Sequence, residues 1–243
     1  MTQTVHGRRV AVTGAASGIG AATARKLIAD GWRVACLDRN LDGARATAGD
    51  HGGAVQIDVA DEASTVSAFA TVREALGGLD ALVTAAGVIE TVPFLDTTVA
   101  QFRRLFDINV IGSFLSVREG AKLMERGSRI CMVASISSYT GGGYVATGSY
   151  ATSKGAVLTM MKSCARALGD RGIAVNAVAP GFIDTPFVAS AMSDPVRRAQ
   201  VVAAVGKVGT AEQIAECAAW LISPAADFVH GSTLIADGGV LMH

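Results

Sequence analysis

The sequence predicts an α/β protein with one parallel β-sheet that is covered by helices on both faces. Short β-branched runs alternate with longer helical patterns along the whole chain, an order typical of doubly wound sheets. The strand-like runs are apolar without alternation, which favours strands buried on both faces. No repeat, low-complexity tract or linker interrupts the sequence, so residues 1–243 are expected to form a single domain with about seven strands.

The first half of the chain is expected to supply four of these strands. In chain order the elements are a strand at 8–14, a helix at 19–31, strands at 33–38 and 53–59 with a short polar helix between them, a helix at 62–78 and a strand at 79–87. Each strand is a short apolar or β-branched run. Glycine closes both long helical patterns, which is where a helix commonly stops.

The second half is expected to supply three more strands and three helices. The elements are a helix at 98–127, a strand at 128–135, a helix at 149–169, a strand at 172–181, a helix at 210–223 with a threonine cap, and a final strand at 232–239. Besides a glycine-rich loop before Tyr150, residues 182–207 look irregular and contain two prolines. Loops of that length are uncommon unless they bind or cover a ligand, so we expect a substrate-binding region there.

Composition excludes several classes of function. Lysine plus arginine equals aspartate plus glutamate, at 21 each, which gives no electrostatic reason to bind nucleic acid or an anionic membrane. No apolar run approaches 18 residues and the N-terminus has no apolar signal region, so neither a membrane span nor export is expected.

Cysteine and histidine usage points to a protein of the cytoplasm that binds no metal. Cys36, Cys131, Cys164 and Cys217 are far apart and lack metal-ligand or redox spacing, so they are expected to be buried free thiols. Free thiols favour a reducing compartment. The four histidines are scattered along the chain, and no metal site is implied.

A glycine-rich turn between the first strand and the first helix indicates nucleotide binding. In "TGAASGIG" (13–20), Gly14, Gly18 and Gly20 allow a tight turn and the close approach of a diphosphate to the backbone. The N-terminus of the following helix would add N–H groups and a positive dipole. This arrangement predicts a Rossmann-type dinucleotide-binding fold.

Asp38, at the end of the second strand, favours NAD over NADP as the cofactor. A carboxylate there accepts hydrogen bonds from the ribose hydroxyls of NAD and repels the 2′-phosphate of NADP. Arg39 is the opposing signal, because an arginine at this place can bind that phosphate. Asp38 could also be an ordinary turn or N-cap residue before the next helix.

Tyr150 and Lys154 in "SYATSKG" (149–155) are one helical turn apart, so both side chains lie on the same face. A free tyrosine has a pKa near 10. A lysine alongside would favour the phenolate and lower that pKa, which would suit an acid/base. The pair could also be an ordinary contact on a helix surface.

With these features, the chain resembles the short-chain dehydrogenase/reductase family over essentially its whole length. The resemblance rests on "TGAASGIG" (13–20), "DV" (58–59), "AAG" (85–87), Asn109 in "DINVIGSF", "YATSK" (150–154), "PGFIDT" (180–185) and "DGG" (237–239). Each motif alone is weak, but together, in this order and at the family's spacing, they are specific. The chain departs from the family at Thr84 and Ala85, where two asparagines usually brace the fourth strand.

The resemblance implies a role for each matching residue. Asp58 and Val59 would line the adenine pocket, and Ile183 and Thr185 would meet the nicotinamide carboxamide. The full set of expected cofactor residues is Gly14, Ser17, Gly18, Ile19, Gly20, Asp38, Asp58, Val59, Ala86, Gly87, Tyr150, Lys154, Pro180, Gly181, Ile183 and Thr185.

The catalytic set implied by the family is Asn109, Tyr150, Lys154 and a serine after the fifth strand. Tyr150 would exchange a proton with the alcohol or carbonyl, Lys154 would bind the nicotinamide ribose, and Asn109 would hold a water. Ser135 ends the fifth strand, where the family's serine lies, whereas Ser137 has the family's usual spacing of 13 from the tyrosine. We expect Ser135 to polarise the substrate, which requires a two-residue insertion near "GGGYVATG".

The function expected from these residues is an NAD(P)-dependent oxidoreductase, with NAD preferred, that interconverts a secondary alcohol and a ketone. Its partners would be a small-molecule substrate and, as in the family, three further copies in a homotetramer. Two alternatives stay open: a dinucleotide-binding sensor with weak or no catalysis, and an isomerase or lyase on the same scaffold.

Overall fold

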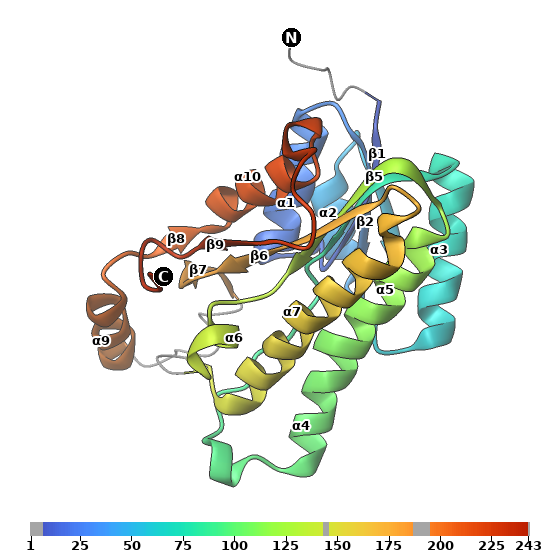
Figure 1. Ribbon diagram of the computed structural model, residues 1–243. Coiled ribbons are helices and arrows are strands. Elements are labelled where there is room, and N and C mark those ends of the chain that lie inside the picture. Colours follow the sequence, from blue (N-terminus) through green and yellow to red (C-terminus); the bar gives the residue numbers. More distant parts are fainter. Residues whose placement is uncertain (1–6, 143–145, 187–194, 243) are drawn as a thin grey trace.

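The computed structural model describes residues 7–142, 146–186 and 195–242, which contain a seven-stranded parallel sheet (Figure 1). The strands are β1 (Arg9–Thr13), β2 (Arg33–Asp38), β3 (Gly53–Gln56), β4 (Leu79–Thr84), β5 (Met124–Val133), β6 (Ala174–Pro180) and β9 (Thr233–Ala236). Their order across the sheet is β3-β2-β1-β4-β5-β6-β9, and every neighbouring pair is parallel. The predicted doubly wound α/β fold is therefore confirmed.

Helices cover both faces of this sheet and enclose two apolar layers (Figure 1). One face carries α1 (Gly18–Ala29), α2 (Leu41–Ala48) and α10 (Ala211–Leu221), and the other carries α3 (Glu62–Leu76), α5 (Gly112–Ala121) and α7 (Gly148–Gly169). Successive strand residues alternate between the layers: Val10 and Val12 belong to one and Ala11 to the other. All three are fully buried, which explains why the strands read as continuous apolar runs.

Two of the predicted helix boundaries have the expected local chemistry. Gly77 follows α3 in the left-handed conformation, with φ at 77°, and its N–H bonds to the Arg73 carbonyl. Thr210 caps α10 in a capping box with Gln213, so both orphan donors at that helix start are satisfied.

The long helix expected at 98–127 is shorter and interrupted. It consists of α4 (Val99–Phe106), a π-helical segment (Asp107–Ile111) and α5, which ends at Ala121. Residues from Met124 onward instead belong to β5, because Leu79 N–H donates to the Leu123 carbonyl at 2.8 Å and Leu79 pairs with Met124. Pairing in the sheet overrides the helical tendency of this stretch.

The segment 182–207, expected to be irregular, contains regular structure. Ile183–Asp184 (β7) pairs with Gly209–Thr210 (β8), and Pro195–Val205 form α9. Pro195, one of the two prolines of this segment, is the first residue of α9, where its missing N–H and fixed φ are tolerated. The middle of the segment, 187–194, lies outside the described residues.

Shorter turns complete the described structure. The glycine-rich loop before Tyr150 contains α6 (Ser137–Thr140), and two 3₁₀ turns are η1 (Phe94–Asp96) and η3 (Pro224–Ala226). Cys36 and Cys131 are buried as expected, whereas Cys164 and Cys217 are only partly buried, and all four are free thiols. Within the residues described, no helix has the length and apolar character needed to cross a bilayer.

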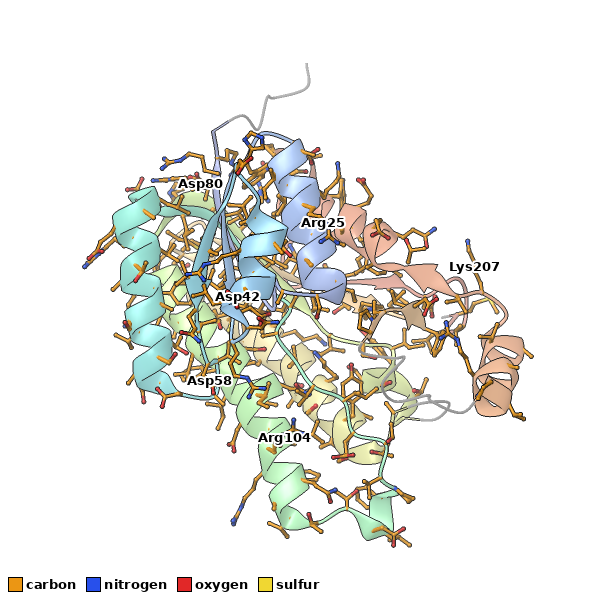
Figure 2. All side chains as sticks on the ribbon, turned by 180° about the vertical axis from the view of Figure 1, so that it is seen from behind. Arg25, Asp42, Asp58, Asp80, Arg104 and Lys207 are labelled. Carbon is orange, nitrogen blue, oxygen red and sulfur yellow. The ribbon has the colours of Figure 1, made fainter. Side chains whose placement is uncertain are left out.

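Because all seven strands are parallel, their carboxyl ends meet at one edge of the sheet. Asp58 follows β3 and Asp80 lies near the start of β4, so these residues mark the carboxyl and amino edges, which Figure 2 shows well separated. Arg9 pairs with Asp80 at 2.9 Å on the amino edge. The loops that leave the carboxyl edge form the candidate site, as is usual for sheets of this type.

Candidate active site

A cavity of about 390 Å³ runs along the carboxyl edge of the sheet. Its walls come from the turns that follow β1 to β6 and β9, and from the start of α7. The sequence-predicted residues that line it are Gly14, Ser17, Gly18, Ile19, Gly20, Asp38, Asp58, Val59, Ala86, Gly87, Ser135, Ser137, Tyr150, Lys154, Pro180, Gly181, Ile183 and Thr185. Asn109 is not part of the lining, because it is fully buried behind it.

The glycine-rich turn brings bare backbone to the cavity wall. A Cβ at Gly14, where φ is 72°, would lie 2.7 Å from the Ala86 nitrogen, and a Cβ at Gly20 would lie 2.1 Å from the Gly14 carbonyl oxygen. Neither position accepts a side chain without movement of the backbone. Ser17 precedes α1 and makes no side-chain cap hydrogen bond, so the first N–H groups of the helix have no side-chain acceptor from their cap. These donors and the helix dipole suit an anionic diphosphate.

Asp38 is held rigidly between this turn and the start of α2. One carboxylate oxygen accepts from the Ala16 N–H at 3.0 Å, and the other accepts from the Asn40 N–H at 2.9 Å. The turn role and the cavity role are therefore compatible, because each oxygen has a further lone pair. Arg39 is exposed at the same end of the cavity, and its guanidinium makes no hydrogen bond or ion pair with a described residue.

The wall beside Asp38 is formed by the residues that follow β3. Asp58 accepts from the Ala60 N–H at 3.0 Å, which fixes its carboxylate in a turn. Val59 is buried against Gly112, where an added Cβ would lie 2.7 Å from a Val59 methyl group. This close approach leaves no room for a side chain at Gly112 and holds Val59 against α5.

Tyr150 lies in the first turn of α7, and its hydroxyl group hydrogen-bonds with that of Ser135. Both side chains are buried in the cavity wall. The Ser137 N–H donates to Ser135 Oγ at 3.1 Å, so the backbone of α6 holds the serine oxygen in place. Ser135 is thus the serine in contact with Tyr150, and the contribution of Ser137 to this contact is its backbone.

Lys154 is buried next to Tyr150, and this burial affects the charge on its side chain. Its ammonium donates to the Val133 carbonyl at 2.9 Å and lies 6.0 Å from the centre of the Tyr150 ring. Burial lowers the pKa of Lys154 to about 8.

The expected lowering of the tyrosine pKa does not occur in the protein alone. Burial raises the pKa of Tyr150 to about 12, the Ser135 hydrogen bond opposes this, and Lys154 makes no resolved contribution. The reason is that the cost of a buried phenolate exceeds the help of an ammonium that is itself desolvated and directed at a backbone carbonyl.

Asn109 ties three elements together behind the cavity. Its Oδ1 accepts from the Val88 N–H at 2.8 Å, and its Nδ2 donates to the Val88 carbonyl and to Ser153 Oγ, both at 3.0 Å. The side chain therefore fixes the loop after β4 against α7. Gly87 lies close to the side chains of both Asn109 and Lys154: a Cβ at Gly87 would lie 3.2 Å from Asn109 Oδ1 and 3.5 Å from Lys154 Nζ.

Thr84 and Ala85, which depart from the family's pattern, leave one polar group unsatisfied. The buried Thr84 Oγ1 has no hydrogen-bond partner among the described residues. Thr13 braces this turn instead, because its carbonyl accepts from the Ala85 N–H at 3.2 Å and its hydroxyl accepts from the Ala86 N–H at 3.3 Å.

Sequence reasoning did not single out several apolar residues of the lining. Val88 and Ile89 follow the recognised "AAG", and Ala146 precedes Tyr150 by four residues. Val240 comes from the C-terminal tail. Their adjacency to motifs was the only signal for the first three, and no local pattern marks Val240.

Comparison with known proteins agrees with this geometry. Residues 14–241 match the family model described as enoyl-(acyl carrier protein) reductase. The chain is 38% identical to 2-(R)-hydroxypropyl-CoM dehydrogenase of Xanthobacter autotrophicus, over 93% of this chain and 96% of that protein. It is also 38% identical to cis-4-hydroxycyclohexanecarboxylate dehydrogenase of Sinomonas cyclohexanicum, over 96% of each.

A solved structure described as a short-chain dehydrogenase/reductase (glucose/ribitol dehydrogenase) from Brucella melitensis superposes with a TM-score of 0.92, at 29% identity and over the full length of both chains. The relatives are dehydrogenases and reductases, so this chain is an oxidoreductase of that type, which uses a nicotinamide cofactor. The chain belongs to the short-chain dehydrogenase/reductase family.

Proposed function

We propose that the protein is an NAD-dependent dehydrogenase that interconverts a secondary alcohol and its ketone. The observation that carries this proposal is the buried pair of hydroxyl groups, Tyr150 against Ser135, in a cavity that also contains Lys154 one helical turn away. A proton donor or acceptor and a second hydroxyl beside it are what a carbinol oxygen needs while its carbon loses or gains a hydride.

The residues along the cavity suit a dinucleotide. The bare glycine backbone and the start of α1 would hold the diphosphate, and Asp38 would accept from the ribose hydroxyls, which favours NAD over NADP. Asp58 and Val59 would hold the adenine, and Ile183 and Thr185 the carboxamide. When bound, the nicotinamide supplies the hydride donor or acceptor and, in its oxidised form, a positive charge.

Tyr150 would act as the acid/base and Ser135 would orient the substrate oxygen. With a pKa raised to about 12, the tyrosine is protonated in the protein alone, so it is ready to donate to a ketone. Oxidation of an alcohol requires the phenolate, and positive charge brought close to the phenol would lower its pKa. Lys154 contributes to that charge and would also bind the nicotinamide ribose.

Asn109 is proposed as a positioning residue. Both donors of its amide and one lone pair of its Oδ1 are already used, so the expected water would bind the other lone pair of Oδ1 or the backbone carbonyl, which also accepts from Ser113 Oγ at 2.7 Å. Segment 182–207 is proposed to complete the substrate site.

We also propose a cytoplasmic homotetramer. Large apolar side chains are exposed on two surfaces: Ile111 and Phe114 around the start of α5, and Trp220 and Phe228 next to η3. The edge strand β9 offers a third contact. A monomer mass in light scattering at micromolar concentration would remove the claim of a tetramer.

A panel of secondary alcohols and ketones, assayed with both NAD and NADP, tests the proposed activity. We expect reduction of NAD by at least one alcohol and a higher kcat/KM with NAD than with NADP. Tight binding of NADH without any turnover across the panel would support a dinucleotide sensor instead.

A further inference from the structure

The order of the strands gives the cavity two distinct ends. Asp38 ends β2, and Arg39 and Asp58 follow β2 and β3, at one edge of the sheet. Val240 follows β9 at the other edge. Figure 2 shows this separation: Asp58 lies far from Lys207, whose side chain would touch a Cβ at Gly238 in the C-terminal tail. Apart from Asp38, Arg39 and Asp58, Lys154 is the one charged side chain among the described residues that line the cavity.

An apolar cluster forms part of the wall around Tyr150, beside the polar side chains of Ser137 and Thr140. Val88 and Ile89 pack with Ala146, Leu105 and Tyr150 in one apolar cluster, apart from the two main layers. The two internal stretches outside the described residues, 143–145 and 187–194, contain no lysine, arginine or histidine.

Phe182 and Val240, which lies in the C-terminal tail, also line the cavity. Asp237 holds that tail, because its two carboxylate oxygens accept from the Gly239 N–H at 2.9 Å and the Leu241 N–H at 2.6 Å. These two bonds bracket Val240. The tail is thereby fixed to β9, and Val240 has a defined place in the cavity.

We propose, building on the proposed dehydrogenase activity, that the substrate is an uncharged secondary alcohol whose non-reacting group is a hydrocarbon. That group packs against the wall of Val88, Ile89, Phe182 and Val240, where burial of apolar surface supplies the binding energy. A carboxylate, sulfonate or phosphate in the same place would lose its hydration opposite apolar side chains. Val240 is a specificity-determining residue in this account.

The test compares hydroxy acids with their own methyl esters, which differ chiefly in charge. Suitable pairs are 3-hydroxybutanoate and cis-4-hydroxycyclohexanecarboxylate, each against its ester, with NAD at a pH where both acids are ionised. We expect kcat/KM to be higher for each ester by about 100-fold, the typical effect of an unpaired charge. Equal or better use of the acids would overturn the proposal.

A binding measurement separates failure of this inference from failure of the proposed activity. The same hydroxy acids and hydroxy esters are titrated into the complex of the protein with NADH. Substrate and cofactor are then both reduced, no hydride can be transferred, and cofactor fluorescence reports binding alone. Tighter binding of the hydroxy esters supports the apolar wall even if no alcohol is oxidised. Tighter binding of the hydroxy acids overturns it, whether or not the enzyme is active.

Two variants of the tail test Val240. Val240→Ala removes two methyl groups, so kcat/KM for the cyclohexyl ester is expected to fall about tenfold, mostly through KM. Met242→Ala is the matched control, because Met242 is 85% exposed and does not line the cavity; its kcat/KM should stay within about twofold. Equal effects of the two variants would show that Val240 does not contact the substrate.

Discussion

The two ends of the cavity are built in different ways. The β1–β3 end is made within residues 13–59, by glycine backbone, one helix start and carboxylates fixed in turns. The β5–β9 end combines segments from five parts of the chain: the loops after β4, β5 and β6, the start of α7 and the tail. The first end suits a ligand that does not vary, and the second can change its specificity one segment at a time.

The largest effect is expected from a substitution that changes the chemistry at one end of the cavity and leaves the other end intact. Tyr150→Phe keeps the ring and removes the hydroxyl group, so kcat should fall by about 10²–10⁴-fold, the usual contribution of a positioned acid/base. The Kd of NADH should stay within a few-fold, because the β1–β3 end is untouched. Steady-state kinetics and fluorescence titration measure the two quantities.

Lys154→Met is the companion to this variant. It should weaken both turnover and NADH binding, because the lysine lies between the two ends and is proposed to serve both. Near-normal turnover in Tyr150→Phe would reduce the Tyr150–Lys154 pair to a structural contact.

Two serine variants test which hydroxyl group acts on the substrate at the β5–β9 end of the cavity. Ser135→Ala should lose about 10²–10³ in kcat/KM, the typical effect of one preorganised donor to developing charge. Ser137→Ala should lose much less, because its backbone N–H, which the substitution keeps, is what supports Ser135. The opposite ranking would mean that the 13-residue spacing identifies the catalytic serine.

Asp38→Ser tests the β1–β3 end and should leave the chemistry at Tyr150 unchanged. The ratio of kcat/KM for NAD to that for NADP is expected to fall by about 10–100-fold, the range for a lost hydrogen bond to a charged group. The Arg39 guanidinium, which has no partner among the described residues, would then be free to meet the 2′-phosphate. Adding Arg39→Ala should remove the gain with NADP. A wild type that already prefers NADP would contradict the assignment of Asp38.

The two ends of the cavity also differ in how much of each could be predicted from the sequence. The glycine turn, Asp38 and all seven strands could be predicted, because each depends on a short stretch and its periodicity. Ser135 beside Tyr150 required knowing where β5 ends. Val240 could not be found, since its place depends on the Asp237 hydrogen bonds and on the pairing of β9 with β6.

Three predictions were wrong: the unbroken helix at 98–127, the start of the fifth strand and the lowered pKa of Tyr150. Each depends on contacts between distant parts of the chain. The start of β5 is set by the pairing between Leu79 and Met124. The helix expected at 98–127 is interrupted by the π-helical segment Asp107–Ile111. The pKa of Tyr150 depends on how deeply the phenol is buried, and the four-residue spacing to Lys154 carries no information about that.

The smallest expected effect concerns stability and does not depend on turnover. Burial lowers the pKa of Lys154 from 10.5 to about 8, so between these pH values the unfolded chain binds a proton that the folded protein lacks. The free energy of unfolding of the wild type should therefore rise with pH in this window, by at most about 1.4 kcal/mol per pH unit. Denaturation of wild type and Lys154→Met in parallel isolates this contribution, because the other groups are common to both. A difference that stays constant from pH 8 to 10.5 would show that burial does not lower the pKa of Lys154.

The central claim is that hydride transfer takes place beside Tyr150 in this cavity. The measurement is the mass of the reduced cofactor formed from the most active secondary alcohol of the panel, carrying deuterium on its carbinol carbon. We expect each reduced NAD to gain one deuterium, with transfer almost abolished in Tyr150→Phe and little changed in Ser137→Ala. Reduced cofactor without deuterium, or undiminished transfer in Tyr150→Phe, would contradict it.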